Sequence, residues 1–517
     1  MSPHLRPILG ILLAGNTILT ATDREQTSHE YSTAKELIDE VSLDEVHLGT
    51  PEIDLRILNS YGERSENIQN LFIQARKSLS LDPAAAFAEN TAILQASLRS
   101  GLTHLGGPML GEVREHGAKV WVRTIEPAPV TVVVQSQDGP RVVGPVDSTV
   151  ESDLTAVVPV DGLEPDTRYT YQVTVDGKPI SMPESATIRT HAAADSPSKM
   201  KLAFGSCLHK RGFVNHSLLS LIRERGNAAM LLFGDLAVDD RNNHLGLHRS
   251  DYLLRDLSQP WQAFSASIPS YAIWDDHDYF DDDLAGIPKS FTDRDRRSVR
   301  KVWMQNWNNP AYGFGNERGG IFFRTRIGPA DLIMLDTRYF RDGDPWTEGS
   351  QTTYLGEAQM QWLEQELLKC EGPFIILTSG TMWSDYISNG KDSWGVWDKP
   401  GRERVLSFIE KHEIPGVLLL SGDRHGARGF RIPRESGHTF YEFEPASLGG
   451  LHGPPIKAND CSEQLFGFAH IYAFGELEFD TTIPDPKVTF RLIKSDGTQL
   501  HETALSLSQL TPPNVSR

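Results

Sequence analysis

Cysteine is scarce in this chain: Cys207, Cys370 and Cys461 are the only three among 517 residues. Small secreted domains that depend on disulfides carry many more, so the sequence excludes a disulfide-stapled scaffold. In an oxidising compartment at most one pair can form, and nothing in the sequence favours pairing of Cys370 with Cys461. The remaining thiol must then be buried, reactive or bound to a metal.

Positive charge is also in short supply. Lys and Arg total 50 against 69 Asp and Glu, which gives a formal net charge of −19. Binding along a nucleic-acid backbone needs a basic surface, so the composition argues against a nucleic-acid partner. A phosphate-bearing substrate stays compatible with this charge, because bound metal ions can reverse its sign locally.

Long hydrophobic runs are missing after the N-terminus. His4 and Arg6 precede an apolar run that starts at residue 7, and small residues follow near Ala21. This pattern predicts a signal peptide over residues 1–22. The run is too short for a comfortable membrane span, and Asn16 stands where a lipoprotein signal would place cysteine. We therefore expect a monomeric protein exported to the periplasm, cell wall or medium, without a transmembrane anchor.

The chain is too long for one core, so several domains are expected. Residues 23–103 are predicted to form a helical extension, loosely attached up to about residue 60, with one helix over 68–79 and a second opening at Asp82-Pro83. Residues 104–195 carry short strands between turns, and the run from Leu163 to Tyr171 resembles that of a fibronectin type III-like β-sandwich, in which a tyrosine pins a corner.

Residues 196–510 alternate strands with helices and are predicted to form an α/β catalytic domain. Each of five buried-strand candidates is followed at once by a polar cluster; these clusters are Gly205-Ser206-Cys207, Gly234-Asp235, Asp275-Asp276-His277-Asp278, Asp336-Thr337-Arg338 and Gly422-Asp423-Arg424-His425. In α/β architectures the carboxyl ends of the strands are where ligands bind. A glycine–aspartate pair after a strand is by itself a common turn, but five clusters in order indicate one site.

The side chains of these clusters suit metal ions. A thiolate, three carboxylates and an imidazole form a donor set for two divalent or trivalent metals; they come from Cys207, Asp235, Asp276, Asp423 and His425. Two metals about 3.5–4 Å apart activate a bridging water and clamp the oxygens of a phosphoryl group. A histidine beside them, such as His277, would protonate the leaving oxygen or stabilise developing charge. The Asp281-Asp282-Asp283 run is interpreted as a solvated loop.

On these motifs the chain resembles the PhoD-like alkaline phosphatases, a branch of the calcineurin-like metallophosphoesterases, over residues 105–500. The resemblance implies a metallophosphoesterase sandwich as the catalytic fold. It also implies that Cys207, Asp235 and His425 hold a first metal, ferric iron in the family, and that Asp235 bridges to a second, usually calcium, completed by Asp276 and Asp423. His277 would be the general acid.

Several alternatives stay open. Arg338 would contact phosphate or form a structural salt bridge to a neighbouring acid. The family's Gly-Asp-x-x-Tyr pattern is broken, because Val238 occupies the tyrosine position and cannot ligate iron; zinc or manganese would then be alternatives. Tryptophans 383, 394 and 397 would either line a substrate pocket or pack in the core.

The sequence therefore predicts an exported, metal-dependent phosphatase or phosphodiesterase that uses a metal-activated water. Two alternatives accompany this prediction. One is a binding or scaffold protein on a degenerate metallophosphoesterase fold, and the other is a phospholipase-like diesterase. The substrate would be a small-molecule or polymer phosphate ester.

Overall fold

A computed structural model describes residues 49–194, 196–236, 243–344, 347, 349–384, 393–450, 453 and 462–513. The predicted signal peptide, Val238 and Cys461 lie outside these ranges. Cys207 and Cys370 are both free thiols. In the part of the chain that is described, every helix is either too short or too polar to traverse a lipid bilayer.

Three helices precede the first strand: α3 (Pro51–Asn59), α4 (Glu66–Leu81) and α5 (Thr91–Ser100). Helix α3 begins where the hydroxyl of Thr50 accepts the N–H of Ile53, and it buries Asp54. The expectation of a loose segment up to residue 60 is therefore wrong from α3 onward. The predicted helix start at Asp82-Pro83 is also wrong, since the Asp82 carboxylate closes a local turn and Asn90 caps α5 instead.

The β-strands between residues 106 and 189 form two sheets around one core. A three-stranded sheet contains β1 (Gly106–Gly111), β2 (Gly117–Arg123) and β5 (Thr155–Asp161). The second contains β3 (Pro129–Ser136), β4 (Gly139–Asp147), β6 (Arg168–Val175), β7 (Lys178–Pro179) and β8 (Thr187–Arg189). Alternating valines of both sheets meet in the core, as the period of two requires. The Tyr169 hydroxyl accepts the N–H of Glu164 at 2.9 Å, so this tyrosine pins a chain corner.

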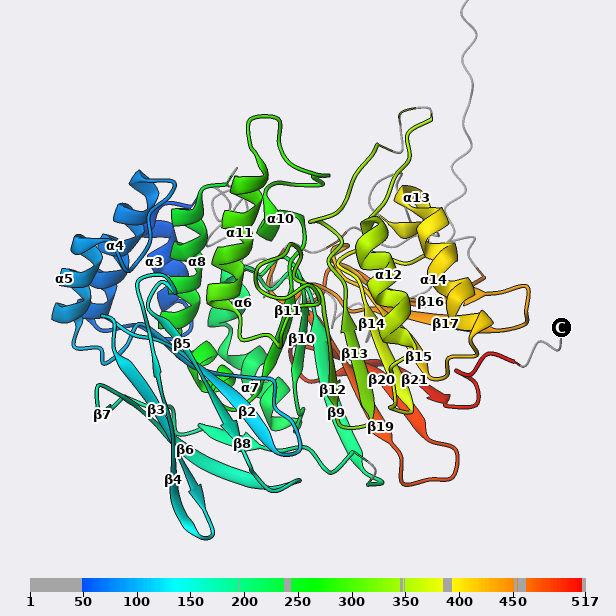
Figure 1. Cartoon of the computed structure of the whole chain (residues 1–517), viewed down its shortest axis with the longest axis horizontal. Coiled ribbons are helices and arrows are strands. Elements are labelled where there is room, and N and C mark those ends of the chain that lie inside the picture. Colours follow the sequence, from blue (N-terminus) through cyan, green and yellow to red (C-terminus); the bar gives the residue numbers. More distant parts are fainter. Residues whose placement is uncertain are drawn as a thin grey trace, which may run out of the picture. The chain divides into compact units, whose positions relative to one another are not determined.

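Two larger sheets follow, and their inner faces share one hydrophobic core. The six-stranded sheet has the order β11 (Ser270–Ile273), β10 (Met230–Phe233), β9 (Lys199–Gly205), β19 (Ala473–Asp480), β20 (Lys487–Lys494) and β21 (Gln499–Ser506). The seven-stranded sheet has the order β12 (Phe323–Ile327), β13 (Ala330–Met334), β14 (Phe374–Thr378), β15 (Val417–Leu420), β17 (Thr439–Glu444), β16 (Ala427–Pro433) and β18 (Gln464–Phe468). Both are visible in Figure 1.

Helices flank these sheets (Figure 1). They are α6 (His209–Val214), α7 (His216–Glu224), α8 (Leu245–Leu257), α9 (Gln259–Ser265), α10 (Asp276–Tyr279), α11 (Asp293–Asn306), α12 (Gly356–Leu367), α13 (Trp394–Trp397) and α14 (Lys399–Lys411). Helices α12 and α14 cover the outer face of the seven-stranded sheet. Helix α4 packs against α8, and Phe72 and Leu79 of α4 share a hydrophobic cluster with Leu253 and Leu254 of α8.

The strand directions place the site. Strand β10 pairs in parallel with both β9 and β11, and β14 pairs in parallel with both β13 and β15. Within each of these two groups the carboxyl ends therefore lie at one edge. The polar clusters predicted from the sequence follow β9, β10, β11, β13 and β15, so the fold presents them at those edges.

Candidate metal centre

Four strand-end loops bring the predicted metal ligands together. Ligand atoms of Cys207, Asp235 and His425 lie within 4.8 Å of one another. The same limit holds for Asp235, Asp276 and His277, and for a third group of Asp275, Asp276 and Asp423. Asp235 and Asp276 each belong to two of these groups, so neighbouring groups share a carboxylate. All five predicted ligands are thus gathered in one cluster, which we call the acidic cluster: Cys207, Asp235, Asp276, Asp423 and His425.

The backbone at this cluster is in an unfavourable conformation. The φ angles of Cys207, Asp235, Asp423 and His425 are 53°, 54°, 77° and 62°, in the left-handed region. For residues other than glycine each such angle costs about 1–3 kcal/mol and persists only where surrounding structure imposes it. Strained backbone conformations of this kind are frequent at functional sites. Here they occur at four of the five residues of the cluster, in the loops that follow the strands.

Burial shifts the pKa values of two members of the cluster, Cys207 and Asp235. Burial raises the pKa of the Cys207 thiol well above its ordinary value, and Asp235 raises it further. Burial also raises the pKa of the Asp235 carboxyl well above its ordinary value; His277 opposes this shift, whereas Asp276 and other nearby acids add to it. The Oδ1 atom of Asp235 is buried, and no donor in the described residues reaches it.

Such a cluster fits a cation. A buried acceptor without a donor is unfavourable, and so is a set of neighbouring acids in a medium of low dielectric constant. Metal ions would supply the missing positive charge and keep the thiol and carboxyls deprotonated. The donor types also differ across the cluster, since Cys207 and His425 offer sulfur and nitrogen, whereas Asp276 and Asp423 offer only oxygen.

Asp276 is held differently from Asp235. Its Oδ1 atom accepts the N–H of His277 at 2.9 Å, and its Oδ2 atom accepts the N–H of Asp283 at 2.8 Å. Burial alone would raise the pKa of Asp276, but the charges of Arg338 and His277 and these two hydrogen bonds hold it well below its ordinary value. Of the three carboxyls in the cluster, Asp276 therefore has a lowered pKa, whereas Asp235 has a raised one.

Arg338 lies behind the cluster and is fully buried. Its Nε and Nη2 atoms donate to the two carboxylate oxygens of Asp275 at 2.6 and 2.8 Å, and Nη2 lies 3.8 Å from Asp276 Oδ2. Of the two roles left open by the sequence, the salt bridge is the one present here, while contact with phosphate stays a prediction. The pairing fixes the loop after β11.

His277 lies at the margin of the cluster, with 13% of its side chain exposed. Its Nε2 atom is 3.7 Å from Asp282 Oδ1. Carboxylate oxygens of Asp282 and Asp283 also come within 4.8 Å of an Asp276 oxygen. The interpretation of this run as a merely solvated loop is therefore incomplete, because Asp283 anchors Asp276 through its backbone.

Sequence reasoning missed the residues that hold the loops. Asp278 accepts the N–H groups of Leu236 and Asp275 at 3.0 and 3.2 Å, which ties the loop after β10 to the loop after β11. The backbone N–H groups of Gly449 and Gly450 donate to the Cys207 carbonyl at 3.1 and 2.8 Å. The glycine pair was the available signal, since a Cβ on Gly449 would meet the Leu208 carbonyl at 2.4 Å.

The tryptophans mostly belong to the core. Trp383 and Trp394 are fully buried and stack on each other with ring centroids 4.8 Å apart. The Arg341 guanidinium lies over the Trp397 ring, with its Cζ atom 3.7 Å from the ring centroid. The core alternative therefore holds for the first two, which pack with α12 and α14.

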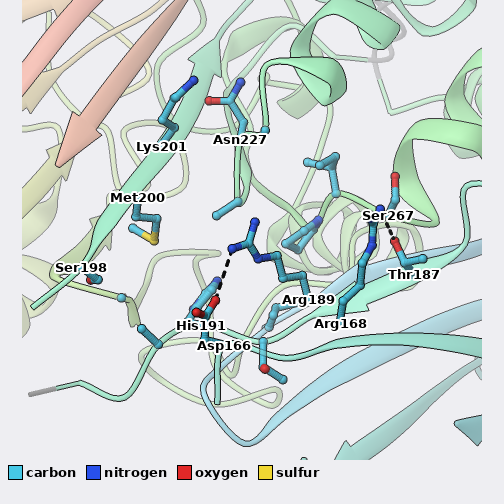
Figure 2. A pocket seen from close by; sticks show the side chains of 18 of the residues that line it. Asp166, Arg168, Thr187, Arg189, His191, Ser198, Met200, Lys201, Asn227 and Ser267 are labelled. Carbon is cyan, nitrogen blue, oxygen red and sulfur yellow. Dashed lines mark hydrogen bonds and ion pairs between the residues drawn. The ribbon is translucent and has the colours of Figure 1, made fainter. Parts of the chain in front are cut away.

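A cavity of about 1420 Å³ lies at the other end of the strands (Figure 2). It is lined by Lys201 at the start of β9, by Asn227, and by Arg189, which pairs with Asp166 at 3.2 Å. No member of the acidic cluster lines it. The cavity is therefore separate from the candidate metal centre, which lies beyond the carboxyl ends of the same strands.

Comparison with known proteins finds a matching family model, a curated relative and a solved structure of similar fold. Residues 235–480 match the family model of the PhoD-like phosphatases, and residues 102–193 match a domain of unknown function, DUF7800. Alkaline phosphatase D of Bacillus subtilis (strain 168) is 25% identical over 321 residues, which cover 52% of this chain and 53% of that protein. The chain thus spans about half the length of this curated relative. The solved structure of PhoD is 18% identical with a TM-score of 0.62, over 80% of this chain and 92% of that one, which shows a shared fold.

Proposed function

Because this chain belongs to the PhoD-like phosphatase family, we propose that it hydrolyses phosphate esters with metal ions held in the acidic cluster. The observation that carries the proposal is the buried Asp235 carboxyl. Its Oδ1 atom has no hydrogen-bond donor among the described residues. Ligand atoms of Asp235 lie within 4.8 Å of those of Cys207 and His425, and also within 4.8 Å of those of Asp276 and His277. A structural role alone would require a compensating cation from the protein.

The donors favour two different ions. Sulfur, nitrogen and oxygen donors of Cys207, His425 and Asp235 suit a transition metal such as iron, zinc or manganese. The oxygen donors of Asp235, Asp276 and Asp423 suit a harder cation such as calcium. Metals held by these residues would lower the pKa of a bound water and neutralise the charge of phosphate oxygens. Iron and calcium follow from the family resemblance, with zinc or manganese as the alternatives raised by Val238.

The chain's own residues perform the remaining tasks. His277 is assigned the proton transfer to the leaving oxygen, because its imidazole borders the cluster and is partly exposed. The Asp282 carboxylate lies 3.7 Å from His277 Nε2, on the exposed side of the imidazole. Arg338 orients Asp275, and through that loop Asp276, without reaching solvent. We assign Arg338 a positioning role.

The domain and targeting assignments belong to the same proposal. Residues 1–22 would direct export of a monomer, residues 23–103 would form a helical extension, residues 104–195 a fibronectin type III-like domain, and residues 196–510 the catalytic unit. In an oxidising compartment a free thiol persists only if burial or a bound metal protects it from oxidation. Cys207 is fully buried, which is compatible with export.

The test begins with elemental analysis of natively purified protein. Phosphate release from p-nitrophenyl phosphate and from bis(p-nitrophenyl) phosphate is then measured before chelation, after chelation and after metal is restored. We expect at least one bound metal per chain and turnover that is lost and regained with it. The two substrates separate monoesterase from diesterase activity, including the phospholipase-like alternative.

A double variant sharpens the assay. Asp235→Asn with Asp423→Asn should abolish turnover while the protein stays folded, and Asp485→Asn on the surface serves as the matched control. Turnover retained by the purified double variant would remove the metal-based mechanism. Metal-free, inactive wild-type protein would favour the binding or scaffold alternative.

A further inference from the structure

Helix α6 begins two residues after Cys207 and buries three consecutive polar side chains. His209, Lys210 and Arg211 are 1%, 0% and 7% exposed. Lys210 is compensated, because its ammonium lies 2.9 Å from Asp54 Oδ1 and 3.2 Å from Asp251 Oδ1. Arg211 is not compensated in this way, although it lies on the same short helix.

The Arg211 guanidinium has one hydrogen bond to protein: Nη2 donates to the Gly450 carbonyl at 3.0 Å. Its Nε and Nη1 atoms are buried and have no hydrogen-bond partner in the described part of the chain. No carboxylate of the described residues lies within 4.0 Å of it. Burial of a guanidinium with two unsatisfied N–H groups is unfavourable unless an anion completes it.

The guanidinium lies close to the acidic cluster but outside it. The Gly450 carbonyl that it contacts belongs to the residue whose N–H donates to the Cys207 carbonyl at 2.8 Å. The Tyr472 hydroxyl donates to the same Gly450 carbonyl at 3.2 Å. Arg211 makes no hydrogen bond or ion pair with the five side chains of the cluster. The Nε and Nη1 donors of Arg211 therefore lie close to the loop that carries Cys207, but they make no hydrogen bond to it.

We propose that Arg211 forms an anionic subsite beside the metal centre, which binds a second carboxylate or phosphate group of the substrate. The proposal rests on the proposed function, in which the metals meet the charge of the scissile phosphate. A planar guanidinium with two free donors matches a carboxylate or phosphate group in geometry and in charge. Esters that carry such a second group are thus the preferred substrate class.

Binding of inert analogues tests the subsite without turnover. Phosphonoacetate and 3-phosphonopropionate are compared by calorimetry with ethylphosphonate and propylphosphonate, in which a methyl group replaces the carboxylate. The titrations use metal-loaded wild-type protein, Arg211→Gln, Arg211→Lys, and Arg404→Gln as a surface arginine control. Hydrolysis of p-nitrophenyl phosphate, which has no second anionic group, is measured in parallel, together with the metal content of each variant.

We expect one carboxylate analogue to bind wild-type protein about ten- to a hundred-fold more tightly than its alkyl match. Arg211→Gln should abolish this ratio, Arg211→Lys should restore part of it, and Arg404→Gln should keep it. Alkylphosphonate affinity, metal content and p-nitrophenyl phosphate turnover should stay within about two-fold in all variants.

Equal binding of both analogues by wild-type protein, or an unchanged ratio in Arg211→Gln, would overturn the subsite while leaving the proposed function intact. An equal loss for all ligands in Arg211→Gln, accompanied by loss of metal, would show that Arg211 only supports the Cys207 loop. Wild-type protein that binds none of the phosphonates would overturn the subsite together with the proposed function.

Discussion

Two buried groups of titratable side chains adjoin helix α6, and they are built in opposite ways. One is the ion-pair cluster of Asp54, Arg76, Lys210 and Asp251. Asp54 lies 2.6 Å from Arg76 Nε and 2.9 Å from Lys210 Nζ, and the Lys210 ammonium is also 3.2 Å from Asp251. Positive and negative groups alternate there, and their side chains are at most 2% exposed.

The acidic cluster lacks that alternation. Among the described residues, two guanidinium groups lie within 4.0 Å of its carboxylates: Arg338 Nη2 is 3.8 Å from Asp276, and Arg424 Nη1 is 3.6 Å from Asp423. Asp235, at its centre, has a carboxylate oxygen without a donor among the described residues. Burial is therefore not the feature that distinguishes a structural from a functional charge cluster. What distinguishes them is whether the protein itself supplies the opposite charge.

The largest effect is expected from Asp235→Asn. Turnover should fall by about a thousand-fold or more, because the shared ligand for both metals is lost. Stability without metal should stay within about 1 kcal/mol, because burial raises the pKa of the Asp235 carboxyl and so favours its uncharged form, which asparagine matches in shape. Phosphate release and thermal unfolding with and without metal check both points. Strong destabilisation of the metal-free variant would mean that Asp235 is a structural charge after all.

Asp54→Asn should give the reverse pattern. Removal of one partner leaves Arg76 and Lys210 buried with less compensation, which typically costs about 3–5 kcal/mol. Denaturant unfolding of the metal-free protein measures this loss. The folded fraction should keep its metal. Combining Asp54→Asn with Lys210→Met should destabilise less than the sum of the two single changes, since both charges disappear together. Additive losses would show that Asp54 and Lys210 do not interact.

The pH dependence of metal stabilisation is a smaller effect. The pKa of Asp235 is higher in the folded than in the unfolded protein, so the folded metal-free protein holds a proton that unfolding releases. Its stability therefore falls as the pH rises above about 4, by at most about 1.4 kcal/mol per pH unit for this group. Metal requires the deprotonated carboxyl and thiol, so its stabilisation should grow with pH. Unfolding midpoints with and without metal between pH 5 and 8 test this. A difference that does not change with pH would contradict the raised pKa.

Local pattern was sufficient for the strands and their ends. The predicted strands at 230–233 and 417–420 coincide with β10 and β15, because short apolar runs end at a glycine or at a serine–glycine pair before an acid. Parallel pairing then makes convergence of the strand-end side chains a consequence of topology. The family resemblance, also carried by these motifs, is confirmed by the matches to the PhoD-like family model and to alkaline phosphatase D.

Long-range pairing was not available from the sequence. Asp54 and Lys210 are 156 positions apart, and Arg338 and Asp275 are 63 apart, so no local spacing announces either contact. The start of α5 was missed for a different reason: Asp82-Pro83 and Asn90 are both plausible N-caps, and only the fold shows that the Asp82 carboxylate is used in a turn. Metal roles of the acidic cluster stay predictions.

The smallest effect should come from a second set of ion pairs, which lies on the surface between α12 and α14. Arg404 of α14 donates to Glu357 and Glu364 of α12 at 2.7 and 2.8 Å, with 38% of its side chain exposed. The hydrogen bonds to these two acids raise the pKa of Arg404, but water and salt screen the pairing. Arg404→Ala should therefore lower the free energy of unfolding by less than about 1 kcal/mol, and high salt should shrink the difference, while turnover stays unchanged. A loss as large as that of Asp54→Asn would show that alternation of charge, rather than burial, sets the strength of these clusters. The expected small loss means instead that alternation stabilises strongly only where water is excluded.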